Sequence, residues 1–305
     1  MAKILLIVKN VTVVVINVMV VNNQPLHIMN TSKLIISTTN NNRGGFNMHL
    51  AETIQQKMAT DQLHSLSDNE LQSLLEQSSS SSLVIDPQDK HYTTGDLISD
   101  LITKDIVSRK QKRDLLKVLI SDKYLFKNID TPLSNDVFKR VFALRLIETL
   151  IKNDDQLIGF LLSDQIDLIS VSLITYLNRE TDYRGYLFSD NNAWLQTFTH
   201  TANVITTIIR HPQVSIDTKI LLSEELLTKY ATYPSHFLFG EEIATSKAIT
   251  YLIKLYPHIE GRVHDYLSAW VPTIEFSTDD DVARYYNHQR FENAFVLSQK
   301  IINSN

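Results

Sequence analysis

The apolar residues of this chain recur at helical spacing over most of its length. The clearest set follows steps of three and four residues, which places all its members on one face of a helix: Val137, Val141, Leu144, Ile147 and Ile151. Prolines and glycines interrupt the pattern at helix-length intervals. We therefore predict an all-α fold, an irregular α-α array of helical hairpins that is helical-repeat-like, with a compact helical bundle as the alternative.

The segment 191–209, NNAWLQTFTHTANVITTII, is unusual because it contains no Lys, Arg, Asp or Glu. A surface helix normally carries charge, so we expect this helix to be central and covered on both sides. One face collects Trp194, Phe198, Ala202, Ile205 and Ile209. The opposite face carries a polar stripe: Gln196, His200, Asn203 and Thr207. Buried polar groups without partners cost about 1–3 kcal/mol each, so the stripe should meet partners or line a wet groove.

The first 47 residues differ in composition from the rest. They begin with MAKILLIVKNVTVVVINVMVV, continue with an asparagine-rich run, and contain no Asp or Glu. They could be a membrane anchor or signal through residues 4–21, or a β-strand added to the helical body. Lys9, Asn10, Thr12 and Asn17 interrupt the apolar run and no small-residue cleavage site follows it, which weighs against the membrane interpretation.

A third interpretation makes residues 1–47 a translated leader. The sequence RGGFNM at 43–48 back-translates to AGR-GGN-GGN-TTY-AAY-ATG, which can contain a purine-rich ribosome-binding site shortly before an ATG codon. A flexible Arg-Gly-Gly loop is the simpler alternative. The composition changes at Met48, where a regular helical pattern begins, so we expect Met48 to be the native start and 1–47 to be leader.

Two parts are expected after this leader. Residues 48–82 form a short helical pair and a Ser-rich linker at 78–82, and Ser67 with Glu70 matches a capping box at the start of the second helix. Residues 83–305 form the main α-helical domain. All 34 acidic residues but only 25 of the 29 basic ones follow residue 47, so this body has a net charge of −9, against −5 for the whole chain.

Composition removes several classes of function. The acidic balance gives no electrostatic footprint for nucleic acid. The basic cluster RKQKR at 109–113 is interpreted as a solvated helix start, with contact to an acidic partner as the alternative. Without cysteine the chain has no disulfide, thiolate nucleophile or Cys-ligated metal site, and it suits a reducing cytoplasm. No phosphate-loop, dinucleotide-binding, zinc-protease or nucleophile-elbow motif is present.

Charged residues gather just before the 191–209 segment. Glu180 and Arg184 are four residues apart and could pair along the preceding helix, which we expect Gly185 to end. If Glu180, Asp182 and Arg184 fold back toward His200, they form a groove for a small polar or anionic ligand, or hold a metal with His200. The simpler interpretation is structural, with Arg184 tying helix ends together and His200 a satisfied core histidine. Because the helix offers only one imidazole, no metal site is assigned.

These residues resemble a bacterial family of helical proteins, the domain of unknown function 2785. Its pattern runs E-x-D-x-R-G-[YW], then G-W-x-H-x-x-x-H-x-x-D one loop later. The matches here are Glu180, Asp182, Arg184, Gly185, Tyr186, Trp194 and His200. Three more elements are similar in order along the chain: DKYLFKNI at 122–129, FKRVFAL at 138–144 through Arg140 and Phe142, and FGEE at 239–242. The resemblance covers roughly 84–256 and implies a helical-repeat-like fold without an established activity.

The chain also departs from the family pattern. Gln196 stands where the family has its first histidine, Asn203 stands at its aspartate, and an arginine expected shortly after Glu242 is missing. If the family's H-x-x-x-H binds a metal, this chain has lost half of that pair. The resemblance therefore informs the fold more than the function.

Taken together, the residues predict a soluble, cytoplasmic binding or interaction module with a polar groove near 180–203 and no cofactor. Its partner would be a protein, a peptide or a small polar ligand. The alternatives are a small-molecule hydrolase that uses the same groove and a membrane-anchored protein that uses residues 4–21. No catalytic residue is assigned. The candidate ligand-binding residues are Glu180, Asp182, Arg184, Trp194, Gln196, His200, Asn203, Glu241 and Glu242.

The leader hypothesis predicts the N-terminus of the protein made in its native cells. Peptide mapping by mass spectrometry should recover peptides from Met48 onward and none from residues 1–47. Recovery of the tryptic peptide 34–43, which lies between Lys33 and the cleavage site after Arg43, contradicts the hypothesis.

Overall fold

The computed structural model describes residues 3–9, 12–18, 45–80, 93–156, 159–187, 193–270 and 276–304. The chain divides into two compact units, Met1–Arg43 and Gly44–Asn305.

The first unit contains an antiparallel hairpin. Strand β1 (Lys3–Lys9) pairs with β2 (Thr12–Val18), so that Lys3 lies opposite Val18 and Lys9 opposite Thr12. Both strands are rich in valine and isoleucine, whose branched side chains favour extended backbone. Within the described part of the chain, no helix has the length and apolar character needed to span a membrane.

The second unit confirms the prediction of an all-α fold. Its described residues form a 3-10 turn, η1 (Pro257–Ile259), and α-helices that are listed in chain order: α1 (Gly45–Ala59), α2 (Asp68–Ser80), α3 (Thr94–Thr103), α4 (Arg109–Leu119), α5 (Val137–Gln156), α6 (Ser163–Arg179), α7 (Thr197–Arg210), α8 (Ile216–Thr232), α9 (Glu241–Leu255), α10 (Glu260–Ala269) and α11 (Asp279–Ser304). Two short strands, β3 (Tyr186–Leu187) and β4 (Ala193–Trp194), pair antiparallel between α6 and α7.

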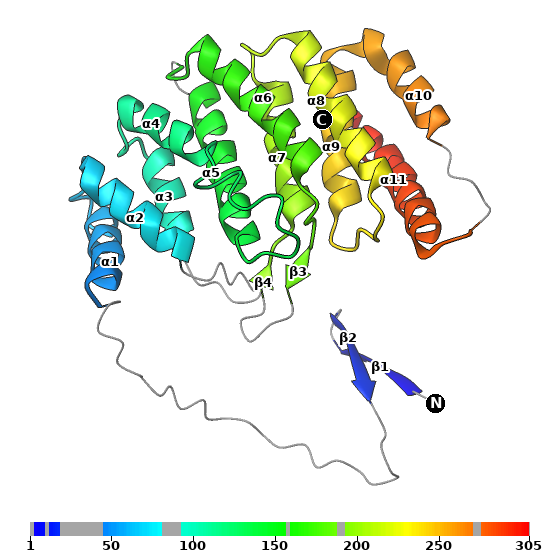
Figure 1. The fold of residues 1–305 in the computed structure, drawn as a ribbon, viewed down its shortest axis with the longest axis horizontal. Helices are drawn as coiled ribbons and strands as arrows, with labels where there is room; N and C mark the ends of the chain where they lie inside the picture. The colour runs from blue at the N-terminus through cyan, green and yellow to red at the C-terminus, as the bar shows by residue number, and fades with distance from the viewer. Residues whose placement is uncertain are drawn as a thin grey trace. The chain divides into compact units, whose positions relative to one another are not determined.

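Alternate helices pack side by side in this unit. Helix α3 contacts α5, α5 contacts α7, α7 contacts α9 and α9 contacts α11, which makes one row, while α6 and α8 pack together in a second row. Figure 1 shows the helices from α2 to α9 following one another across the unit roughly in chain order, with α11 beside α9. We propose on this basis that the unit is an array of helical hairpins, because each helix packs mainly on neighbours that are close in sequence.

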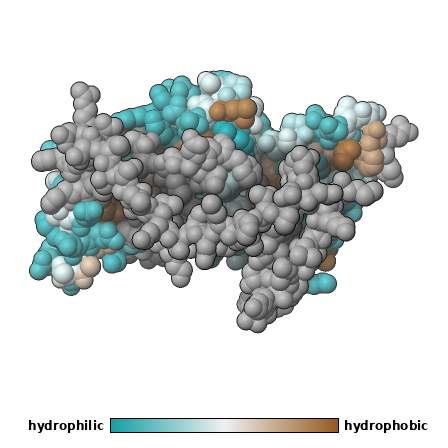
Figure 2. Space-filling model, turned by 90° about the horizontal axis from the view of Figure 1, so that it is seen from below, coloured by the Kyte–Doolittle hydropathy of each residue, from teal (hydrophilic) through white to brown (hydrophobic). Residues whose placement is uncertain are grey.

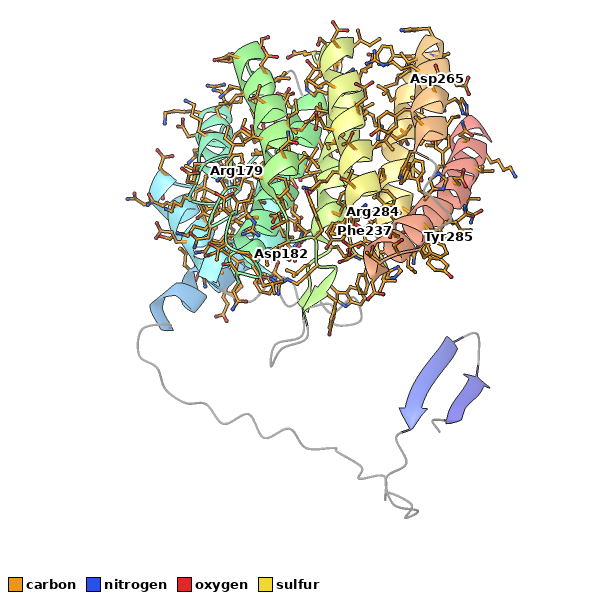
Figure 3. The ribbon with its side chains drawn as sticks, turned by 45° about the vertical axis from the view of Figure 1, so that its right-hand side comes forward. Arg179, Asp182, Phe237, Asp265, Arg284 and Tyr285 are labelled. Atoms are coloured by element: carbon orange, nitrogen blue, oxygen red, sulfur yellow. The ribbon has the colours of Figure 1, made fainter. Side chains whose placement is uncertain are left out.

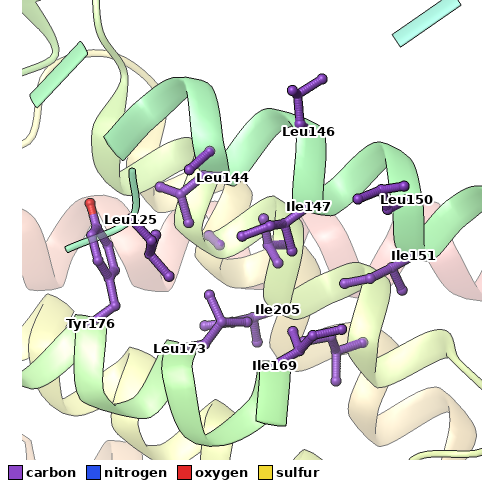
Figure 4. Close-up of a cluster of buried hydrophobic side chains, with 14 of the residues drawn as sticks. Leu125, Leu144, Leu146, Ile147, Leu150, Ile151, Ile169, Leu173, Tyr176 and Ile205 are labelled. Atoms are coloured by element: carbon purple, nitrogen blue, oxygen red, sulfur yellow. The ribbon is translucent and has the colours of Figure 1, made fainter. Parts of the chain in front are cut away.

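The core runs between the two rows. All members of the predicted apolar stripe of α5 are buried: Val137, Val141, Leu144, Ile147 and Ile151. Figure 4 shows Leu144 and Ile147 of α5 close to Leu173 of α6 and Ile205 of α7. The burial of these residues confirms the predicted apolar face of α5, and this face contributes to the packing of both rows.

One local prediction is confirmed and two differ from the structure. The Ser67 and Glu70 capping box is present, with the Ser67 backbone N–H donating to the Glu70 carboxylate at 2.9 Å. Of the Ser-rich stretch 78–82, predicted as a linker, residues 78–80 belong to α2, and the last two lie outside the described residues. Helix α1 begins at Gly45, three residues before the predicted start at Met48.

The basic cluster at 109–113 is only partly solvated. Its Lys112 is fully buried. The ammonium donates to Asp105 at 2.5 Å and to Asn153 of α5 at 2.7 Å. A buried ammonium is stable only when it is paired and hydrogen-bonded. The interpretation of the whole cluster as a solvated helix start is therefore wrong at Lys112, which ties α4 to α5.

The exposed apolar residues of the second unit are scattered. Figure 2, which views the structure from below, shows separate brown patches among mostly hydrophilic described residues. The most exposed large apolar side chains include Leu133 at 68% and Ile243 at 60% of their full surface. Single exposed apolar residues are normal on proteins, so exposure alone does not mark a site.

Candidate functional site

A buried ion pair anchors the segment that follows α6. Glu180, the residue after the last turn of α6, accepts two hydrogen bonds from the Arg140 guanidinium of α5, at 2.6 and 3.1 Å, and both side chains are fully buried. Arg140 also donates to the carbonyl of Lys127 at 2.9 Å, and Glu180 accepts from the backbone N–H of Asp182 at 2.9 Å. All hydrogen-bonding atoms of these two side chains are therefore paired within the fold.

The predicted pairing of Glu180 with Arg184 is wrong, because the chain leaves the helix before it reaches Arg184. Helix α6 ends at Arg179, and the Arg184 guanidinium turns back on Asp182, with two hydrogen bonds at 2.7 and 2.6 Å. Arg184 also approaches the carbonyl of Ser134 at 3.4 Å. Asp182 is buried and lies at the lower end of the helices in Figure 3.

Gly185 does not end a helix, contrary to the prediction, but allows a close contact. A Cβ atom at this position would lie 1.9 Å from Cδ2 of Phe239, so only glycine leaves room for the ring. The same ring packs edge-to-face on Trp194, with centroids 5.3 Å apart, and Trp194 packs on Tyr186 at 4.9 Å. The R-G-Y, W and F-G-E-E elements of the sequence thus meet in one aromatic cluster.

Glu241 and Glu242 begin α9 and point to different partners. The Glu241 carboxylate is buried and accepts from the backbone N–H of Phe239 at 2.7 Å, and its burial raises its pKa. Glu242 accepts from Arg290 of α11 at 2.8 Å through Oε1, while its Oε2 has no hydrogen-bond partner among the described residues. Both residues therefore help to fix the start of α9, and neither is bonded to the polar stripe.

The predicted helix 191–209 is shorter than expected. Helix α7 starts at Thr197, and Trp194 lies in β4, so Trp194 is not on the helical apolar face. The turn is marked by Gln196, whose φ of 46° is in the left-handed region. Helix α7 is central, in contact with α5, α6, α8 and α9. The part of the predicted loop at 188–192 lies outside the described residues.

The polar stripe forms one half-buried face of α7. Gln196, His200, Asn203 and Thr207 are each neither fully buried nor fully exposed. The side-chain amides of Gln196 and Asn203 make no hydrogen bond to the described part of the chain, and the Thr207 hydroxyl donates to the carbonyl of Asn203 at 3.0 Å. The opposite face carries Phe198, which is fully buried.

His200 and Arg145 form the electrostatic centre of this face. Burial, with a smaller contribution from the Arg145 charge, lowers the pKa of His200 to about 4, so the ring is neutral at physiological pH. Arg145 of α5 donates to Asp96 of α3 at 2.9 Å through Nη2. Three buried atoms here have no partner among the described residues: Arg145 Nη1, Thr199 Oγ1 and His200 Nδ1.

The structure thus divides the predicted site in two. Glu180, Asp182 and Arg184 belong to closed ion pairs, whereas His200 and Asn203 belong to the half-open stripe. Across the described part of the chain, no group of three or more His, Asp or Glu residues could hold a metal ion. Arg140 and Arg145 take part in these contacts but were not among the predicted site residues. Arg140 was marked by the FKRVFAL element, but Arg145 has no sequence signal except its helical face.

The buried ion pair predicts a large loss of stability for Glu180→Gln. The variant leaves the Arg140 guanidinium buried beside a neutral amide, which should lower the free energy of unfolding by about 3–5 kcal/mol in urea titrations. Asp130→Asn is a matched control, because it breaks the Arg179–Asp130 pair, also 2.6 Å long but exposed. That control should lose far less stability than Glu180→Gln, because water screens an exposed pair. Equal losses in both variants would contradict the structural role of Glu180.

The neutral state of His200 predicts a pH dependence of stability. Between about pH 6.5 and 4 the unfolded chain takes up a proton at this histidine and the folded chain does not, so its contribution to stability is full above that window and is lost as the pH falls. Wild-type protein should therefore lose more free energy of unfolding between about pH 7 and 5 than His200→Gln. Histidine NMR should show the same ring titrating near pH 4; a normal titration near pH 6.5 overturns the assignment.

Comparison with known proteins adds the family but no activity. The model of the family described as "Protein of unknown function (DUF2785)" matches residues 125–297, more than half of the 305-residue chain. The match starts later and ends later than the range of 84–256 expected from the motifs, and it includes Arg140, the ion-paired segment and the polar stripe. No curated protein and no solved structure matches the chain. The chain therefore belongs to this family of proteins of unknown function.

Proposed function

We propose that the protein is a binding module and that its ligand contacts the polar stripe of α7 together with Arg145 of α5. The observation that carries the proposal is the half-buried polar face of α7, where the side-chain amides of Gln196 and Asn203 make no hydrogen bond to the described part of the chain. Beneath it, Arg145 Nη1, Thr199 Oγ1 and His200 Nδ1 are buried and have no partner among the described residues, so a ligand satisfies them only if the side chains over them turn aside.

The free-energy balance supports a ligand at this place. Leaving a buried donor or acceptor unpaired costs about 1–3 kcal/mol, which is a large fraction of the stability of an ordinary domain. Elsewhere on α7 the hydroxyl groups are satisfied by backbone carbonyls, with Thr201 donating to Thr197 at 2.9 Å and Thr206 to Ala202 at 2.8 Å. Thr197 and Thr207 are satisfied in the same way, so Thr199 is the exception among the threonines of α7.

These contacts reduce the set of predicted site residues that are available to a ligand. Glu180 and Asp182 are already bonded to Arg140 and Arg184, so their role is structural. The hydrolase alternative needs a free carboxylate beside His200, and the charged group that acts on His200 is Arg145. We therefore place the ligand on the stripe and assign no catalytic step.

The proposal is tested by a screen against three defined sets of probes: capped peptide pools, a glycan array and a collection of small polar metabolites. Each ligand of the wild-type protein is then titrated against Asn203→Leu and His200→Leu. Losing one hydrogen bond should weaken binding about tenfold. Asn178→Leu, the same change at an exposed position of α6, is the matched control and should leave the affinity unchanged.

Circular dichroism and melting curves must show that all variants fold. The proposal fails if no probe binds, or if every ligand of the wild-type protein binds the stripe variants and the control equally well.

A further inference from the structure

We propose that the ligand of the polar stripe is an uncharged, extended stretch of polypeptide, held by its backbone N–H and C=O groups along α7. This inference rests on the proposed binding function and adds the chemical class of the ligand. It follows from the hydrogen-bonding chemistry of the stripe, from its length along the helix and from the charges beside it.

Each side chain of the stripe can serve a peptide group. The amides of Gln196 and Asn203 both donate and accept, and a neutral imidazole at His200 has one nitrogen of each kind. The Thr207 hydroxyl has given its hydrogen to the carbonyl of Asn203, so its oxygen remains as an acceptor. A peptide backbone presents both donors and acceptors, so it complements this set better than an ion, which needs only one kind.

The length of the stripe suits a short extended chain that lies along the helix. The helical part of the stripe, from His200 to Thr207, spans about 10 Å, because each helical residue rises about 1.5 Å. That is the length of roughly three extended residues. Gln196 lies just before this part, as the N-cap residue of α7.

The charges beside the stripe are compensated at its centre. Arg145 is paired with Asp96 at 2.9 Å, and the stripe residues themselves are neutral. An isolated anion would therefore gain little net Coulomb attraction there.

Helix α9 supplies the contacts for side chains of such a peptide. Arg210, at the end of α7, lies over the ring of Tyr251 on α9 at 5.1 Å, which shows that the exposed faces of the two helices adjoin. Ile243 and Lys247 precede Tyr251 by eight and four residues, and both are exposed, so they continue the same face of α9. This row offers apolar and aliphatic surface parallel to the stripe.

The test uses capped decapeptide pools made only of uncharged residues, measured by fluorescence anisotropy against the full chain. The best binder is then resynthesised with N-methyl groups on alternate backbone nitrogens, which remove N–H donors and keep every side chain. We expect one N-methyl register to weaken binding at least about tenfold. Asn203→Leu should have a similar effect, Asn178→Leu should have none, and affinity should change little between low and high salt because no charge is matched.

The outcomes separate this inference from the proposed function. Glycans or small metabolites that bind in a stripe-dependent way, while no uncharged peptide does, would overturn the peptide inference and leave the binding function in place. Peptide binding that ignores N-methylation in both registers, or that disappears in high salt, would also overturn it. If no probe depends on the stripe, both proposals are wrong.

Discussion

The hydrogen-bonded pair of Arg140 and Glu180 is the constraint on which the described arrangement depends. Both groups are fully buried, and a lone charge in that position would be unstable, so each requires the other. Arg140 comes from α5 and also holds the carbonyl of Lys127, while Glu180 also receives the backbone of Asp182. One ion pair therefore joins the loop before α5, helix α5 and the segment after α6.

The position of α7 follows from that junction. With the segment after α6 held, the Arg184 carbonyl receives the Thr197 hydroxyl at 3.3 Å, and the Gly185 carbonyl receives the backbone N–H groups of Leu195 and Gln196. Phe239 then closes on Gly185, which sets the entry to α9. Tyr183 meets Phe198 edge-to-face, with centroids 5.0 Å apart, and this contact buries the apolar face of α7. Glu180, Asp182 and Arg184, the charged residues that the sequence marked as a candidate site, therefore help to orient α7, the helix that carries the unpartnered groups.

The sequence predicted what depends on local periodicity and missed what depends on distant partners. The buried stripe of α5 and the polar stripe of α7 follow from residue spacing along a single helix, so both were found. The partner of Glu180 lies 40 positions away in the sequence. The rule that residues four apart can pair on a helix pointed to Arg184 instead. Trp194 fitted the helical apolar face, but the left-handed backbone at Gln196 starts the helix after it. Such tertiary contacts and backbone breaks leave no periodic signal, which is also why Arg145 was missed.

The distribution of satisfied and unsatisfied groups on α7 separates fold from function. Thr197, Thr201 and Thr206 are buried and bonded to carbonyl oxygens, so the polar content of the buried side serves the fold. Thr199 and His200 stand between those positions in sequence, but their Oγ1 and Nδ1 atoms have no partner among the described residues. If α7 only filled space between α5 and α9, apolar residues at these two positions would make the unit more stable. The proposed ligand of the stripe would offset this cost.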